Sequence, residues 1–121
     1  MPFPVEVALI HEAERQLGRK LPMDLRVRLH RENGGDVRAI GDMWRLFPVF
    51  DASDRKRIAR TASHIIRETL DARGRVGFPE GAIAIAEDGG GNLLIVRAGS
   101  DEVEFWDHET GESEPVHVDW R

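Results

Sequence analysis

Hydrophobic residues in the first third of the chain recur at helical spacing. Between residues 5 and 17 an apolar residue occurs at every fourth position, which predicts an amphipathic helix that ends at Gly18. A second helix is predicted to begin within residues 21–24, because proline is tolerated in a first turn and Asp24 suits the positive end of the helix dipole. It should stop at Asn33-Gly34-Gly35, since glycine readily adopts the left-handed conformation that closes many helices.

A third and longer helix is predicted between Ser53, which can cap its start, and Gly74, which can close its end. Its apolar stripe consists of Ile58, Ala62, Ile65, Ile66, Thr69 and Leu70. The segment before it, residues 37–50, mixes large apolar side chains with Gly41 and Pro48. That mixture predicts short extended pieces that pack over the core.

Beyond residue 80 the hydrophobic pattern changes to that of strands. Strands are predicted at residues 82–86, 93–96, 102–106 and 116–119. The segments between them are rich in Gly, Asp, Asn, Ser and Thr, which accept the geometry of tight turns. We therefore expect an antiparallel β-meander in the second half of the chain and an α+β fold overall.

Trp106 occupies an informative position in the third of these strands. Strict alternation places it on the face opposite Val103 and Phe105, beside Glu102 and Glu104. If that face is exposed, a tryptophan rimmed by carboxylates is a good anchor for a basic partner. If a bulge or sheet curvature turns the side chain inward, Trp106 belongs to the core instead. The sequence leaves both alternatives open.

Composition supports one folded domain over residues 1–121. Of the 121 residues 40% are hydrophobic and 32% charged, which favours a packed interior over disorder. The absence of cysteine excludes disulfides, thiolate nucleophiles and cysteine-based metal sites. The chain shows neither a secretory signal nor an apolar run of about 20 residues, so we expect a cytoplasmic protein without membrane contact.

The net charge of −5 is distributed unevenly along the chain. Residues 1–75 contain 15 Lys and Arg against 11 Asp and Glu, whereas residues 76–121 contain 2 against 11. The acidic C-terminal third should repel phosphate backbones and attract basic proteins. A basic cluster at Arg55, Lys56, Arg57 and Arg60 is the alternative nucleic-acid contact, but no nucleic-acid-binding motif accompanies it, and we expect no nucleic-acid partner.

Several short motifs, taken in order, resemble those of SMI1/KNR4 (SUKH) domains over nearly the whole chain. They lie in residues 10–18, in Leu21-Pro22, in Asn33-Gly34-Gly35, in residues 44–48, in residues 85–92 and in residues 103–109. The resemblance implies a sheet with helices packed on one side. It also implies a protein-binding function, because bacterial members act mainly as immunity proteins that neutralise toxins and some eukaryotic relatives are regulatory interaction modules.

The family has no shared catalytic residues, so the resemblance implies a non-enzymatic protein without a cofactor. Combined with the charge pattern, it predicts a basic protein partner such as a toxin domain, bound by a monomer or weak dimer. The residues expected to bind this partner lie on the acidic strands and their turns: Glu87, Asp88, Asn92, Asp101, Glu102, Glu104, Trp106, Asp107, His108 and Glu109.

The alternative is a small ligand-binding or hydrolytic enzyme built around Asp107, His108 and Glu109, which have the residue types of an acid/base pair. It requires that these side chains converge on a deep pocket. The glycine-rich segment 88–92 joins two strands instead of leading into a helix, so a phosphate loop is not expected there. The five histidines are spread over different predicted elements, and no metal site is expected.

Overall fold

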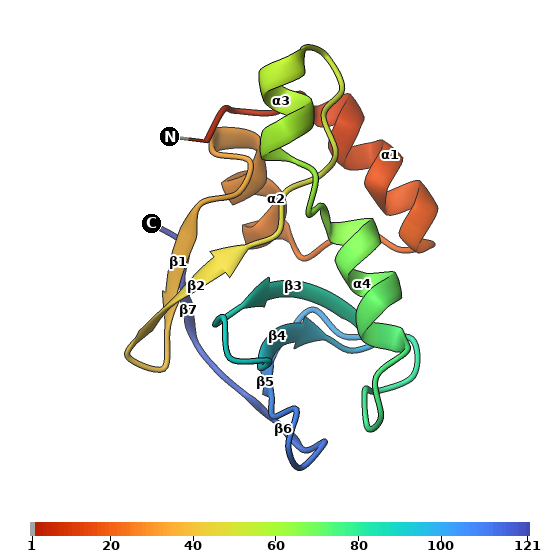
Figure 1. The fold of residues 1–121 in the computed structure, drawn as a ribbon, viewed down its shortest axis with the longest axis vertical. Coiled ribbons are helices and arrows are strands. Elements are labelled where there is room, and N and C mark those ends of the chain that lie inside the picture. The colour runs from red at the N-terminus through yellow and green to blue at the C-terminus, as the bar shows by residue number, and fades with distance from the viewer. Residues whose placement is uncertain (1) are drawn as a thin grey trace.

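The structure is a computed structural model that covers residues 2–121. Its helices lie together on one side of a strongly curled sheet (Figure 1). The elements within the described residues are α1 (Val7–Leu17), α2 (Met23–Arg31), β1 (Asp36–Ala39), β2 (Asp42–Leu46), α3 (Arg55–Arg60), α4 (Ile65–Arg73), β3 (Ile83–Glu87), β4 (Leu93–Val96), β5 (Val103–Trp106), β6 (Ser113–Pro115) and β7 (Val118–Asp119). The predicted α+β class is confirmed.

All neighbouring strands are antiparallel, in the order β6-β5-β4-β3-β2-β1-β7. β6 and β7 stand at opposite ends of this order although only residues 116 and 117 separate them along the chain. The sheet must therefore curl until its two edges come close together, as Figure 1 shows. The prediction of a last meander strand at residues 116–119 was wrong, because β6 completes the meander and β7 crosses to pair with β1.

The first two helices pack their apolar faces into the core. α1 buries Ile10 and Ala13 and ends as predicted at Gly18, whose φ of 74° is left-handed. α2 buries Leu25 and Leu29, but it ends at Arg31, earlier than the glycine pair. The reason is Glu32, which is already extended with a φ of −147°.

The predicted third helix is two helices, α3 and α4, separated by a break at residues 61–64. Bonds to the preceding loop replace helical hydrogen bonds at this break. The Thr61 hydroxyl accepts from the Asp51 amide at 3.0 Å, and the Ile65 amide donates to the Pro48 carbonyl at 2.7 Å. The caps also differ from the prediction, because the side chains of Asp54 and His64, not Ser53, accept hydrogen bonds in the first turns of α3 and α4.

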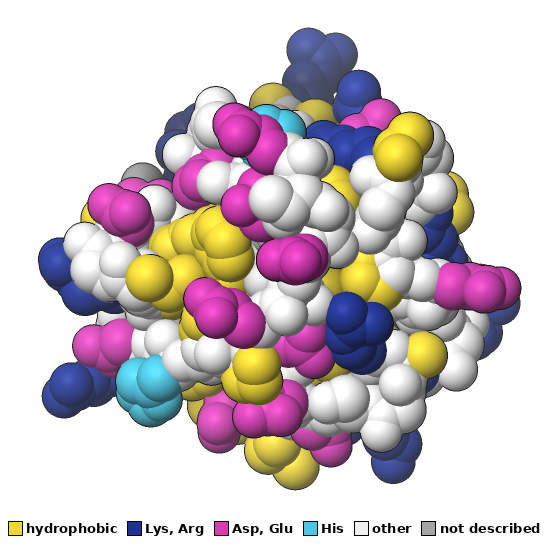
Figure 2. All heavy atoms as spheres, turned by 90° about the horizontal axis from the view of Figure 1, so that it is seen from below, with side chains coloured by type: hydrophobic (Ala, Val, Ile, Leu, Met, Phe, Trp, Pro, Cys, Tyr) yellow, Lys and Arg dark blue, Asp and Glu magenta, His cyan; other side chains and the backbone are white. Residues whose placement is uncertain are grey.

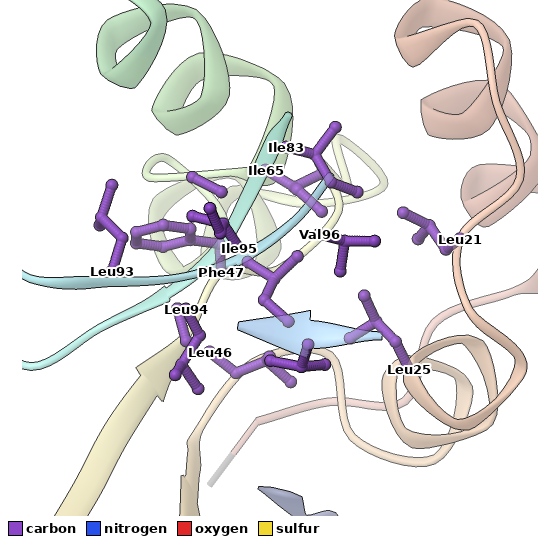
Figure 3. Packing of buried hydrophobic residues seen from close by; sticks show 14 of the residues in the cluster. Leu21, Leu25, Leu46, Phe47, Ile65, Ile83, Leu93, Leu94, Ile95 and Val96 are labelled. Atoms are coloured by element: carbon purple, nitrogen blue, oxygen red, sulfur yellow. The ribbon is translucent and has the colours of Figure 1, made fainter. Parts of the chain in front are cut away.

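The core lies between the helices and the curled sheet. Leu21, Leu25, Phe47 and Ile65 meet the apolar residues of β3 and β4 there (Figure 3). β4 is buried along its whole length, as expected for a central strand that is covered on both faces. α4 packs closely on β3, so that the Thr69 hydroxyl donates to the Ala84 carbonyl (3.3 Å) and accepts from its amide (3.0 Å).

Candidate protein-binding surface

Basic and acidic side chains gather at opposite ends of the molecule. α3, with its basic cluster, forms the upper end in Figure 1, and the β3–β4 and β5–β6 loops lie in the lower half. Seen from below, acidic side chains spread over the centre of the lower face, and Lys and Arg side chains lie mainly at its margin (Figure 2). The charge difference between the two parts of the sequence is therefore also a separation in space.

The β3–β4 and β5–β6 loops are joined by a chain of hydrogen bonds. The Asp88 carboxylate accepts from the Gly90 amide (2.7 Å) and from the backbone amide and Nδ2 of Asn92 (3.2 and 3.0 Å). Asn92 Oδ1 accepts from the His108 amide at 3.1 Å and lies 2.8 Å from His108 Nδ1. The predicted residues Asp88, Asn92 and His108 are thus brought together, and they hold the two loops in one arrangement.

The loop between α4 and β3 is fastened to the same end. Arg75 donates from Nη1 to the Gly91 carbonyl at 3.3 Å. Gly77 approaches the β5–β6 loop so closely that a Cβ placed on it would lie 3.0 Å from the Gly111 Cα. Three loops therefore form one continuous surface, and we call the surface of residues 75–77, 88–92 and 107–114 the acidic end.

The β5–β6 hairpin carries a shallow hollow of about 200 Å³ within the acidic end. Its apolar part is Phe105, whose ring packs edge-on against buried Trp44 with 5.8 Å between centroids. The charged residues that line it are the acids Asp107, Glu112 and Glu114. Such a combination of an aromatic ring and carboxylates fits a lysine or arginine side chain.

Several of the predicted carboxylates are occupied by partners within the protein. Ion pairs join Glu87 to Arg45 (2.9 Å), Asp101 to Arg19 (3.0 Å) and Glu104 to Arg97 (3.1 Å). Glu104 also accepts from the Ser113 hydroxyl at 2.7 Å. In each of these pairs an arginine partly offsets the negative charge of the carboxylate.

Other carboxylates have no side-chain partner within residues 2–121. Between residues 101 and 114 these are Glu102, Glu109, Glu112 and Glu114, and all four are exposed. The sequence-based hypothesis extended the binding turns as far as Glu112 and did not include Glu114. The available signal was the turn composition of Glu109-Thr110-Gly111-Glu112, which places acids on both sides of a hairpin tip.

Trp106 is not the exposed anchor that one of the two alternatives expected. Its side chain is fully buried, it packs edge-on against Phe78 with 5.3 Å between centroids, and Nε1 donates to the Gly77 carbonyl at 3.2 Å. The register of β5 with β4 is regular, so no bulge in β5 causes this burial. The loop after α4 covers the sheet face at this point, and Trp106 belongs to the core.

The predicted binding residues do not form one site. Asp88, Asn92, Asp107, His108 and Glu109 lie at the acidic end. Glu102 and Asp101 precede β5, on the side of the sheet where Asp101 meets Arg19 after α1. The predicted residues on the loops therefore lie together at the acidic end, apart from Asp101 and Glu102.

Asp107, His108 and Glu109 do not converge on a deep pocket. Asp107 Oδ1 accepts from the Glu109 amide at 2.8 Å, which is a turn contact, and the side chains of His108 and Glu109 are exposed. The hollow on the hairpin is lined by Asp107 but not by His108 or Glu109. The geometry gives this trio no acid/base arrangement around a bound substrate.

The basic cluster of α3 is partly committed to contacts within the protein. Arg57 pairs with Asp54 at 2.5 Å and approaches Asp51 at 3.6 Å. The guanidinium groups of Arg57 and Arg60 lie over the Phe3 ring, 4.1 and 4.7 Å from its centroid. Arg57 and Arg60 therefore take part in the packing of the N-terminal segment.

Within the described part of the chain, no group of three or more His, Asp or Glu side chains is arranged to hold a metal ion. In residues 2–121 we also find no helix with the length and apolarity that crossing a membrane requires.

Comparison with known proteins identifies the family. The model of the SMI1/KNR4 family (SUKH-1) matches residues 4–120, which is nearly the whole chain. Neither the comparison with curated proteins nor that with solved structures gave a match. The family match agrees with the observed α+β architecture, in which helices cover one side of a curled antiparallel sheet. The chain therefore belongs to the SMI1/KNR4 (SUKH-1) family.

Proposed function

We propose that this protein is a cytoplasmic immunity-type module that neutralises a cognate toxin domain by binding it through the acidic end. The observation that carries the proposal is the set of exposed, unpaired carboxylates Glu109, Glu112 and Glu114 on a hairpin whose hollow has an aromatic wall. Membership of the SMI1/KNR4 family supports the choice of a binding function over a catalytic one.

The partner should be a basic protein. Each free carboxylate offers a charge-assisted hydrogen bond to an arginine or lysine, and Phe105 offers a ring against which the stem of that side chain can pack. The loops are already cross-linked by the Asp88, Asn92 and His108 contacts, so little ordering entropy is lost on binding. Binding to a toxin in this way requires no chemical step.

The charge separation should orient the approach of the partner. With the basic α3 at one end and the acidic loops at the other, the electric field directs a basic surface to the loops before contact. This effect acts on the association rate and is screened by salt over about 8–10 Å.

A capture experiment with matched variants tests the proposal. Tagged wild-type protein should retain a basic protein from the cytosol of the organism that encodes it, and a toxin domain encoded beside this chain is the expected capture. The double variant Glu112→Lys/Glu114→Lys should lose that protein.

The control is Glu6→Lys/Asp24→Lys, which changes the net charge equally at exposed, unpaired acids on the helical side. It should retain the same protein. Equal capture by both double variants would show that the acidic end is not the binding surface.

A further inference from the structure

His108 is held by a relay of hydrogen bonds that begins at Asp88. Asn92 Nδ2 donates to Asp88 Oδ2 at 3.0 Å, which turns the other end of the amide, Oδ1, toward His108. Oδ1 accepts from the His108 backbone amide at 3.1 Å, and a backbone N–H can only donate. Two independent contacts thus fix the same orientation of the Asn92 amide.

This orientation determines which ring nitrogen of His108 carries the proton. His108 Nδ1 lies 2.8 Å from Asn92 Oδ1, an atom that can only accept, so Nδ1 must be protonated. In the neutral ring Nε2 then bears a lone pair. Nε2 has no partner within residues 2–121, and the residue is exposed.

Gly91 fixes the position of the ring as well. A Cβ on Gly91 would lie 3.0 Å from three atoms of the His108 ring, so the imidazole rests directly on the glycine backbone. Gly91 itself has a left-handed φ of 102° and is tied through its carbonyl to Arg75. A larger residue here would displace the ring and the relay with it.

We propose that His108 is the directional hydrogen-bond acceptor with which the acidic end selects an arginine or lysine N–H of its partner. This inference rests on the proposed function, because it deepens the description of the same surface. The carboxylates attract any cation, whereas a fixed Nε2 lone pair accepts only a donor that arrives along one direction. His108 is therefore a specificity-determining residue.

The tautomer is measurable without any partner. In ¹⁵N-labelled protein near pH 8, long-range ¹H–¹⁵N spectra should show His108 protonated on Nδ1. Asn92→Ala should shift the ring toward the Nε2-protonated form that free histidine favours. A wild-type His108 protonated on Nε2 would overturn the inference directly.

Recognition is tested with a hexa-arginine peptide as probe, titrated at low salt and pH 7.5. His108→Phe keeps a flat ring without the acceptor and should weaken binding about five- to tenfold. His117→Phe, a change at another exposed histidine, should leave the affinity unchanged.

The outcomes separate this inference from the proposed function. If the peptide binds wild type and His108→Phe equally, the role of His108 is refuted and the acidic end remains a basic-ligand surface. If wild type does not bind the peptide even at low salt, the proposed function fails and the role of His108 fails with it.

Discussion

The side chain of Asn33 is hydrogen-bonded to both backbone groups of Val49. Its Oδ1 accepts from the Val49 amide at 2.8 Å and its Nδ2 donates to the Val49 carbonyl at 2.9 Å, and both bonds are buried. This pair joins the end of α2 to the segment that leaves β2. The Asn-Gly-Gly motif therefore ties two distant segments together and does more than stop a helix.

Asn33→Ala should destabilise the protein by about 2–4 kcal/mol, because it leaves a buried N–H and a buried C=O of Val49 without partners. Urea unfolding followed by circular dichroism measures the change. Asn92→Ala, at the other asparagine of the chain, breaks exposed side-chain bonds that water can replace and should cost less than about 1 kcal/mol. Similar losses in the two variants would contradict the structural role of Asn33.

Ile65 lies at the start of α4 with no exposed surface, and the same helix carries Leu70 with 62% of its surface exposed. Ile65→Ala should cost about 2–5 kcal/mol of unfolding free energy, because it opens a cavity under the helix. Leu70→Ala removes the same type of side chain from the outer face and should change stability by less than about 0.5 kcal/mol. Thermal or urea unfolding measures both changes. A larger loss of stability for Leu70→Ala than for Ile65→Ala would mean that α4 presents its other face to the sheet.

Ile40 has a left-handed φ of 54° in the two-residue turn between β1 and β2, with 54% of its surface exposed. A β-branched residue is strained in this conformation, whereas asparagine is favoured there. Ile40→Asn should therefore raise the unfolding free energy by roughly 1 kcal/mol. Ile40→Val keeps the branched side chain and should gain nothing, so equal stability of the two variants would argue against strain at this turn.

His64 caps α4, because its Nδ1 accepts from the Arg67 amide at 3.3 Å. Burial, and to a smaller extent the charge of Arg67, hold its pKa below the ordinary value near 6.5. The unfolded chain then binds the proton more readily than the native state, so stability should fall as the pH drops through 6.5 and below.

The variant that tests this is His64→Asn, which keeps a capping side chain but does not titrate. Urea midpoints at pH 7.5 and 5.5 should show a larger loss for wild type than for His64→Asn. Parallel losses would exclude His64 as the source of the pH dependence.

Sequence periodicity predicted helices before residue 75 and strands beyond residue 80, since each pattern depends on local spacing. It missed the break between α3 and α4 because the bonds that cause it, from Thr61 to Asp51 and from Ile65 to Pro48, join positions that no local pattern connects. The crossing of β7 to β1 was missed for the same reason. It depends on pairing between residues 38–39 and 118–119, which are far apart in the sequence.

Trp106 shows where alternation alone does not decide burial. Alternation assigned it to the face of Glu104, but different neighbours cover that face along β5. Phe78 and Gly77 bury Trp106, whereas Glu104 reaches Arg97 and Ser113 and stays partly exposed. The sequence could not show that Glu112 and Glu114 are unpaired, because the partner of each carboxylate depends on which side chains the fold brings near it.

The most direct test of the acidic end is the association rate with the captured partner, measured by stopped flow over a range of salt concentrations. Glu112→Lys/Glu114→Lys should slow association at low salt and flatten its salt dependence, because it removes the charge that directs encounter. Glu6→Lys/Asp24→Lys should have a smaller effect at the same net charge, since its sites lie on the helical side. Equal association rates for wild type and Glu112→Lys/Glu114→Lys at low salt would contradict the account, and the interface would then lie elsewhere on the molecule.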